Sequence, residues 1–311
     1  MRKNCNIDFT YRKRYNESIL QNMEVSDLTS GKCCVSILIP CYNHEKYVVD
    51  CLNSIWNQTY SNYEIIICDD ASKDGSVEQI KTIEQKFTDR NIRFVLLENE
   101  TNQGITKNIN RMLKKATGEY IKIIASDDML YPNYLETMVK FMEHNKKIKL
   151  SFSNCICVKD TAKYVPDADV LADTIFDTLP DCKNNVFERL YLCNFIPAPA
   201  VMIRKSVLDE FGGYDETIAI EDLEMILHIL SVYPDSIAGI EECLVYYRMN
   251  PSSISSAKKN AGAKKRIQFM FKNSMAIAKK YKKFVRHSIY TKRVSQLYIS
   301  YILNRIHLII D

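Results

Sequence analysis

Residues 118–132 read GEYIKIIASDDMLYP, and this stretch decides how the rest of the chain is interpreted. Residues 120–125 are mostly apolar and partly β-branched, which predicts a buried strand that ends at Ser126-Asp127-Asp128. Ligands of open α/β sheets bind outside the carboxyl ends of the strands. Mg²⁺ and Mn²⁺ prefer oxygen ligands and substrate phosphates, so the paired carboxylates predict a metal–diphosphate site. The alternative is that these polar residues cap a following helix.

Length and composition limit the class of protein. A chain of 311 residues exceeds one compact core, so one large α/β domain with an appendage, or two domains, is expected. Residues 1–15 are polar, and no run is long and apolar enough to cross a bilayer, so neither a signal peptide nor a membrane span is expected. The eleven cysteines lack a Cys-x-x-Cys pair, and several lie in apolar runs, which is typical of reduced thiols in a cytoplasmic protein.

The charge is divided unevenly along the chain. Residues 251–310 contain fourteen of the 42 basic residues and no Asp or Glu. Within them, residues 266–289 have apolar residues at helical spacing with lysines around the rest, which predicts a basic amphipathic helix on an anionic membrane surface. The alternative is a helix that packs on the preceding domain with a solvated basic face. No nucleic-acid-binding module accompanies the charge, so nucleic acid is not an expected partner.

Strand-like and helix-like patterns alternate after a polar extension at residues 1–33. Strands are predicted at 34–40, 63–68, 92–97 and 120–125, and the helices between them at 44–56, 76–87 and 105–115. This alternation predicts a parallel sheet with right-handed crossovers. Polar residues follow every predicted strand, and the carboxyl ends of parallel strands share one edge. We therefore expect these polar residues to converge on one ligand.

Three segments carry a resemblance to a known family. They are PCYNHEKYVVDCLNSIWNQTY (40–60), IIICDDASKDGS (65–76) and ENETNQGITKNINRMLKKATGEYIKIIASDD (98–128). Over residues 35–249 the chain resembles the family-2 inverting glycosyltransferases. The resemblance implies the α/β GT-A nucleotide-sugar-binding fold, with a mixed, mostly parallel central sheet and flanking helices. It implies a domain at 34–250, with a nucleotide-binding half (34–130) and an acceptor half (131–250), before a basic helical tail at 251–311.

The resemblance also implies residues that bind the nucleotide-sugar. Pro40 and Tyr42 correspond to the loop that packs on the nucleotide base. Asp69 corresponds to the acidic residue that pairs with the base, where a carboxylate accepts the N3–H of uracil and so favours a UDP-sugar donor. Lys107 stands where arginine is common, and it keeps the positive charge without the bidentate fork. Arg248 either contacts the diphosphate or pairs with an acidic strand neighbour.

Asp127 and Asp128 match the family's metal motif, which implies a divalent cofactor, Mn²⁺ or Mg²⁺. Ala125 stands where many members have a first aspartate, so both carboxylates are metal candidates. The resemblance implies that the metal bridges the diphosphate and offsets charge on the leaving group. Asn250 replaces a histidine often found in the family, and no ligand role is carried over to it.

Glu221 and Asp222 resemble the family's Glu-Asp motif at a helix start. By resemblance Asp222 is the base that removes the proton of the acceptor hydroxyl, and Glu221 supports it. The alternative is that both residues only place negative charge in the first turn of a helix, where the helix dipole favours it.

The expected function is an inverting hexosyltransferase that moves a sugar from a UDP-sugar to a cell-surface glycan or lipid-linked saccharide, peripheral at the cytoplasmic face of the membrane. A sugar-phosphate nucleotidyltransferase should carry a glycine-rich basic loop after its first strand, whereas this chain has PCYNHE. The second alternative is a glycosyltransferase-like scaffold subunit without activity. Ala125, Lys107 and Asn250 favour it, and the four aspartates at positions 69, 127, 128 and 222 oppose it.

Overall fold

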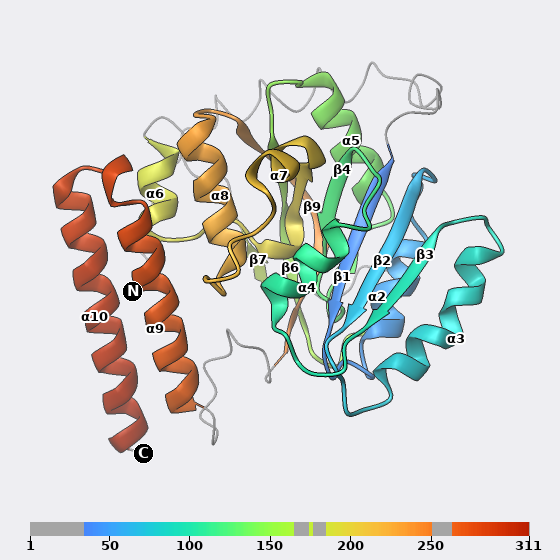
Figure 1. Cartoon of the computed structure of the whole chain (residues 1–311), viewed down its shortest axis with the longest axis horizontal. Helices are drawn as coiled ribbons and strands as arrows, with labels where there is room; N and C mark the ends of the chain where they lie inside the picture. Colours follow the sequence, from blue (N-terminus) through green and yellow to red (C-terminus); the bar gives the residue numbers. More distant parts are fainter. Residues whose placement is uncertain (1–33, 165–173, 177–184, 251–262, 311) are drawn as a thin grey trace.

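The computed structural model describes residues 34–164, 174–176, 185–250 and 263–310 (Figure 1). The predicted extension at 1–33 and the start of the predicted tail, residues 251–262, lie outside these ranges. Within them, nine strands form one mixed sheet in the order β3-β2-β1-β4-β8-β6-β9-β5, and β7 pairs with β6.

The first four strands supply the predicted parallel part of the sheet. They are β1 (Val35–Cys41), β2 (Tyr63–Asp69), β3 (Phe94–Glu98) and β4 (Tyr120–Ile123). The later strands are β5 (Met129–Leu130), β6 (Leu150–Lys159), β7 (Thr174–Phe176), β8 (Val201–Arg204) and β9 (Ile237–Met249). β8 pairs antiparallel with β4 and β6, whereas β9 runs parallel to β6. The mixed sheet expected from the sequence is therefore confirmed.

Helices connect and cover the strands. Those of the first half are α2 (Val48–Trp56), α3 (Ser76–Thr88), α4 (Ile105–Leu113) and α5 (Tyr134–His144). Those of the second half are α6 (Val186–Leu192), α7 (Lys205–Phe211), α8 (Glu221–Val232), α9 (Ala263–Lys280) and α10 (His287–Ile310). The short 3₁₀ helices are η2 (Ala198–Ala200) and η3 (Lys282–Phe284).

The sheet is buried on both faces, as strands of a parallel sheet usually are. Successive side chains of a strand point to opposite faces. Ile37 and Ile39 of β1 join a core with α2, α3 and α5, whereas Leu38 joins a second core with α4, α7 and α8. The side-chain alternation of one apolar strand thus builds two hydrophobic layers.

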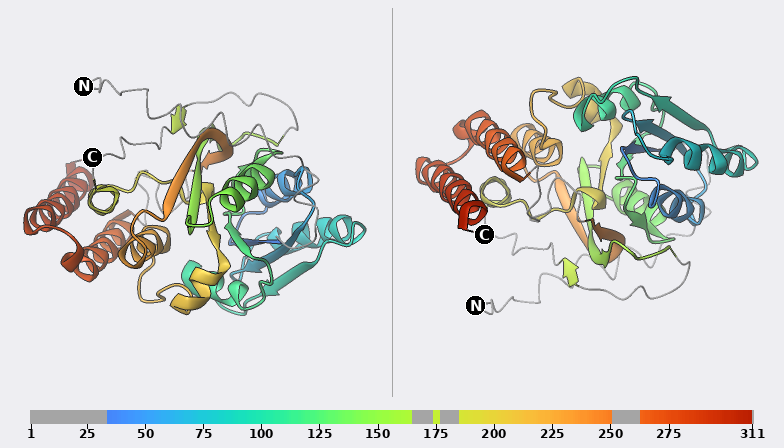
Figure 2. Two further views of the ribbon diagram at one scale, coloured as in Figure 1. Left: turned by 90° about the horizontal axis from the view of Figure 1, so that it is seen from above. Right: turned by 90° about the horizontal axis from the view of Figure 1, so that it is seen from below.

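The basic tail differs from the single helix predicted at 266–289. α9 ends at Lys280, η3 follows, and α10 begins at His287. Ile277, Ala278 and Tyr281 are buried in the core that contains α8, and the Tyr281 hydroxyl donates to Glu224 Oε1 at 2.6 Å. The apolar face of α9 therefore packs on the domain, as the alternative interpretation expected. Figure 2 shows α9 and α10 side by side at one end of the molecule. No helix among the described residues is long and apolar enough to cross a bilayer.

Candidate active site

The parallel strands bring the predicted nucleotide-binding residues to one sheet edge. Pro40 lies opposite Cys68 in the β1–β2 ladder, and Cys41 lies opposite Asp69. Tyr42 follows β1 with 45% of its side chain exposed, so its ring is open to a ligand. Asp69 is buried and accepts hydrogen bonds from the backbone N–H of Ser72 at 2.9 Å and from its hydroxyl at 2.5 Å. A fixed carboxylate thus lies beside an exposed aromatic ring.

Asp70, the neighbour of Asp69, shapes the loop that precedes α4. It accepts backbone hydrogen bonds from Gln103 at 2.7 Å and Gly104 at 2.9 Å. Burial opposes ionisation of Asp70, but these hydrogen bonds outweigh burial and lower its pKa. Gly104 has φ 85°, in the left-handed region that glycine adopts without strain. The loop places Lys107, whose side chain is exposed, in the first turn of α4.

Hydrogen bonds tie α4 to the segment that leads into α8. The Thr106 hydroxyl donates to the Ile218 carbonyl at 3.2 Å, and the Asn110 amide donates to the Tyr214 carbonyl at 2.9 Å. Gly213 lies against Asn110 with φ 94°, and a Cβ at Gly213 would lie 2.6 Å from Asn110 Oδ1. Only glycine fits there. Helix α4 is therefore tied to the segment that precedes α8.

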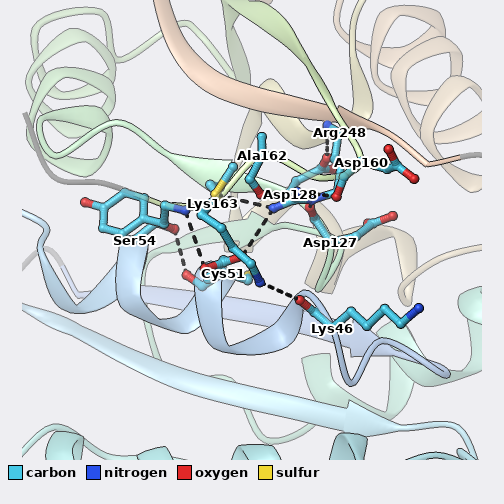
Figure 3. Close-up of polar contacts among 12 residues, drawn as sticks. Lys46, Cys51, Ser54, Asp127, Asp128, Asp160, Ala162, Lys163 and Arg248 are labelled. Carbon is cyan, nitrogen blue, oxygen red and sulfur yellow. Dashed lines mark hydrogen bonds and ion pairs between the residues drawn. The ribbon is translucent and has the colours of Figure 1, made fainter. Parts of the chain in front are cut away.

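The structure separates the two carboxylates that follow β4 (Figure 3). Asp128 is 2% exposed, and its Oδ1 accepts the backbone N–H of Arg248 at 2.8 Å. Burial, and then the charge of Asp127, raise the pKa of Asp128 well above its ordinary value. Asp127 instead meets the Asn250 amide at 3.1 Å and His44 Nε2 at 3.8 Å. Both carboxylates were predicted from the sequence as metal ligands. Asp127 is the better candidate, because Asp128 already accepts the backbone N–H of Arg248.

Arg248 is a buried clamp behind this pair. Its guanidinium donates to the Asp127 carbonyl at 2.6 Å, to the Asp160 carbonyl at 2.9 Å and to the Ala162 carbonyl (Figure 3). Its Nη2 lies 3.7 Å from Asp50 Oδ2, and the Arg248 side chain has no exposed surface. Its acidic neighbour, Asp50, lies on α2 and is not the strand neighbour that the sequence interpretation named. The donors of Arg248 point into the protein, and its contact with the nucleotide-sugar stays a prediction.

His44 was missed as a site residue in the sequence. Its Nδ1 lies 2.7 Å from Ser126 Oγ, and its Nε2 faces Asp127. The signal was present, since His44 follows β1 in the same PCYNHE loop as Tyr42, at an edge already assigned to a ligand. Asp50, on the buried face of α2, gave no sequence signal beyond its place in an apolar helix.

A divalent ion at this edge would need several protein or substrate ligands. Among the described residues, no group of three or more His, Cys, Asp or Glu side chains could hold a metal by itself. The Asp127 carboxylate is the donor type that suits Mn²⁺ or Mg²⁺ when substrate phosphates complete the coordination. The Asn250 amide turns its N–H toward Asp127, and the His44 imidazole is a donor that these ions favour less, so both are neighbours of the carboxylate. The carboxylate fits a metal shared with a diphosphate.

The two predicted acid–base residues begin α8. Glu221 and Asp222 are half-buried and line a small, mostly apolar cavity with Tyr214 and with Ile123 of β4. The Asn194 amide donates to Asp222 Oδ2 at 3.1 Å. Burial raises the pKa of Asp222, and burial together with the charge of Asp222 raises the pKa of Glu221 to about 8. A carboxyl pair with raised pKa therefore lies against the strand that leads to Asp127.

The sequence matches the family described as "Glycosyl transferase family 2" over residues 36–212. The chain is 37% identical over 112 residues to the putative glycosyltransferase EpsE of Bacillus subtilis. The matched region covers 36% of this chain and 39% of EpsE. It is 30% identical over 226 residues to Escherichia coli WfaP, named UDP-Glc:alpha-D-GlcNAc-diphosphoundecaprenol beta-1,3-glucosyltransferase. This matched region covers 72% of this chain and 80% of WfaP.

Solved structures share the fold at low sequence identity. S. aureus TarS 1-349 in complex with UDP-GlcNAc superposes with a TM-score of 0.59 and 18% identity, over 85% of this chain and 71% of that chain. The mannosyltransferase PcManGT of Pyrobaculum calidifontis, in complex with GDP-Man and Mn²⁺, gives a TM-score of 0.54 and 17% identity, over 90% and 73% of the chains. The expected GT-A-like α/β fold is thereby confirmed.

Proposed function

We propose that this chain, which belongs to glycosyl transferase family 2, transfers a hexose with inversion from a UDP-sugar to a saccharide acceptor. The observation that carries the proposal is the carboxyl pair Glu221–Asp222, which shares a cavity with β4, the strand that leads to Asp127. A proton acceptor and a diphosphate-binding edge are thus built on adjoining elements.

The nucleotide end of the donor has matching partners. The exposed ring of Tyr42 offers a stacking surface for a base, and Asp69 offers carboxylate oxygens to the N3–H of uracil. A UDP donor is supported by the name of WfaP, a UDP-Glc enzyme, and by the UDP-GlcNAc complex of TarS. Lys107, exposed at the start of α4, supplies positive charge at the same edge.

Asp127 is the residue we propose to hold a divalent metal, with His44 and Asn250 beside it. When bound, such an ion supplies positive charge that offsets the charge of the departing diphosphate. The Mn²⁺ in PcManGT supports this cofactor. Arg248 positions Asp127 by donating to its backbone carbonyl, and the buried Asp128 carboxylate in turn accepts the backbone N–H of Arg248.

Asp222 is the proposed base. Its carboxylate accepts the proton of the acceptor hydroxyl while that oxygen bonds to the anomeric carbon, and the bond to the nucleoside diphosphate breaks on the opposite face. A base works best with a pKa near the working pH, so the raised pKa values of this carboxyl pair suit the role. The amide of Asn194 orients the Asp222 carboxylate.

The acceptor we propose is a lipid-linked saccharide. The support is the name of WfaP, whose acceptor is a GlcNAc-diphosphoundecaprenol. The half-buried Glu221–Asp222 pair, whose pKa values are raised, requires only an acceptor hydroxyl at the cavity. A surface glycan that is made on such a lipid therefore fits the same chemistry.

The test is UDP release by the full chain with Mn²⁺, a panel of UDP-sugars and a GlcNAc-diphospholipid acceptor. We expect one donor to support transfer and Asp222→Asn to lower kcat by about 10²–10⁴-fold while UDP still binds in calorimetry. Asp209→Asn, which alters an exposed carboxylate of α7, is the matched control and should match the parent chain. Unchanged turnover in Asp222→Asn would refute the base. A chain that fails to bind UDP at all would favour the scaffold alternative.

A further inference from the structure

The carboxyl-terminal half of α10 has an exposed apolar face. Tyr298, Ile299, Ile302 and Leu303 are 49%, 57%, 51% and 52% exposed. Their spacing places them on one side of the helix. The other side packs against the protein, because Leu297 contacts the core and Tyr301 stacks on Phe271 of α9 with ring centroids 4.5 Å apart. Tyr298 also contacts the Phe271 ring, with centroids 5.1 Å apart, and so helps to hold α10 on α9. Its exposed part and the side chains of Ile299, Ile302 and Leu303 form the outward face.

Such a cluster requires an explanation. Single exposed apolar side chains are ordinary, but a contiguous group on one helix face marks an interaction site. By contrast, the apolar face that the sequence assigned to a membrane, within 266–289, is occupied by packing at Ile277, Ala278 and Tyr281. Phe269 of α9 and Phe284 of η3 remain 40% and 39% exposed, so the larger group of exposed apolar residues is the one on α10.

The positive charge around this face indicates which kind of partner would bind there. The adjoining half of α9 presents Lys264, Lys265 and Lys272 to solvent, and Arg305 is exposed on α10. Residues 263–305 contain no Asp or Glu. An anionic bilayer surface satisfies both features at once, because its headgroups attract the lysines while the apolar side chains enter the interface.

The orientation of the helices relates this surface to the proposed site. α10 and β1 run in the same downward direction in Figure 1, so the carboxyl-terminal half of α10 lies toward the edge where the strands β1 and β2 end. The exposed half of α10 and the carboxyl ends of these strands therefore lie toward the same side of the molecule in this view.

We propose that the docking surface, defined as Tyr298, Ile299, Ile302 and Leu303 with Lys264, Lys265, Lys272 and Arg305, holds the protein on an anionic bilayer. α10 lies in the interface and does not cross it. This inference goes beyond the proposed function, and it would stand whichever sugar or acceptor the site uses.

Flotation of the full chain with lipid vesicles tests the docking surface. The chain should float with vesicles of phosphatidylcholine and phosphatidylglycerol, and salt should weaken this binding. Ile299→Glu/Leu303→Glu should lower partitioning by at least roughly tenfold. Lys264→Gln/Lys265→Gln/Lys272→Gln should lower it on the order of a hundredfold, since each lysine near an anionic surface contributes about fivefold. Val232→Glu, at a 45% exposed aliphatic residue of α8, is the matched control and should float like the parent chain.

Three results would overturn the proposal. They are a parent chain that does not float, an Ile299→Glu/Leu303→Glu variant that floats unchanged, and a control variant that fails equally. Light scattering identifies the competing occupant: a dimer that Ile299→Glu/Leu303→Glu converts to a monomer, with no vesicle binding, would assign the face to a second copy of the chain. UDP binding, measured by calorimetry in every variant, separates failure of docking from failure of the proposed function.

Discussion

Replacing Arg248 with methionine removes the clamp behind Asp127 and retains an unbranched apolar side chain. The guanidinium donates to the carbonyls of Asp127, Asp160 and Ala162 and lies 3.7 Å from Asp50. Asp50 would keep its ion pair with Lys163, whose Nζ lies 3.3 Å from Asp50 Oδ2, so the main loss is that of the donors to the three carbonyls. Because the arginine side chain is fully buried, water cannot readily replace these donors, and a buried acceptor left unsatisfied costs about 1–3 kcal/mol. With three carbonyls affected, we expect the free energy of unfolding to fall by about 3–5 kcal/mol.

Urea unfolding followed by tryptophan fluorescence measures this loss, because Trp56 on α2 is the single tryptophan of the chain. Lys81→Met is the control. Lys81 also forms an ion pair, with Glu98 at 2.9 Å, but the two side chains are 53% and 51% exposed. Exposed ion pairs contribute about 0–1 kcal/mol, so the control should lose no more than that.

The same variant should weaken the site as well as the fold. With the Asp127 backbone no longer held, we expect Arg248→Met to weaken Mn²⁺ binding, measured by calorimetry, by about 10–100-fold, the usual cost of losing an outer-shell partner. A loss of unfolding free energy below about 1 kcal/mol, equal to that of Lys81→Met, would refute the proposed role of Arg248 in holding Asp127.

Three further predictions concern single residues. Asp127→Asn should abolish calorimetric Mn²⁺ binding, whereas Asp128→Asn, which keeps an acceptor for the backbone N–H of Arg248, should retain it; the reverse order would move the metal to Asp128. Glu221 has its pKa raised from 4.5 to about 8 in the folded chain, so the folded state binds the proton more tightly and this stabilisation is lost as pH rises from about 4.5 through 8. Urea titrations over that range should show a falling free energy of unfolding, and Glu221→Gln should flatten the fall; an identical slope would exclude Glu221 as its source. Gly213→Ala should lower the free energy of unfolding by about 1–3 kcal/mol, because alanine disfavours φ 94° and its Cβ would approach Asn110 Oδ1; an unchanged urea midpoint would contradict this.

The first half of the fold was predictable because its signals are local. The strands expected at 34–40, 63–68 and 120–125 correspond to β1 (Val35–Cys41), β2 (Tyr63–Asp69) and β4 (Tyr120–Ile123). Each is a short apolar run bounded by turn residues, and such a run has few other ways to be buried. Their common direction followed from the helices between them, since parallel neighbours require crossovers.

The second half was less predictable because it depends on pairing between distant segments. The antiparallel pairing of β8 with β4 and the parallel pairing of β6 with β9 join residues far apart in sequence. The extent of the basic helix was also wrong. Periodicity continued across Tyr281, but the packing of that residue against Glu224 coincides with the end of α9.

The sequence by itself determined the fold class and the strand ends at which polar side chains gather, because both follow from local periodicity and from motifs within a few turns of chain. Only the tertiary structure decided what each charged residue faces. Asp127 and Asp128 are adjacent in sequence, yet one meets His44 and Asn250 while the other is buried under Arg248. Successive side chains leave the backbone in different directions, and the residues that receive them, His44 near the start of the domain and Arg248 and Asn250 near its end, are distant in sequence from both aspartates.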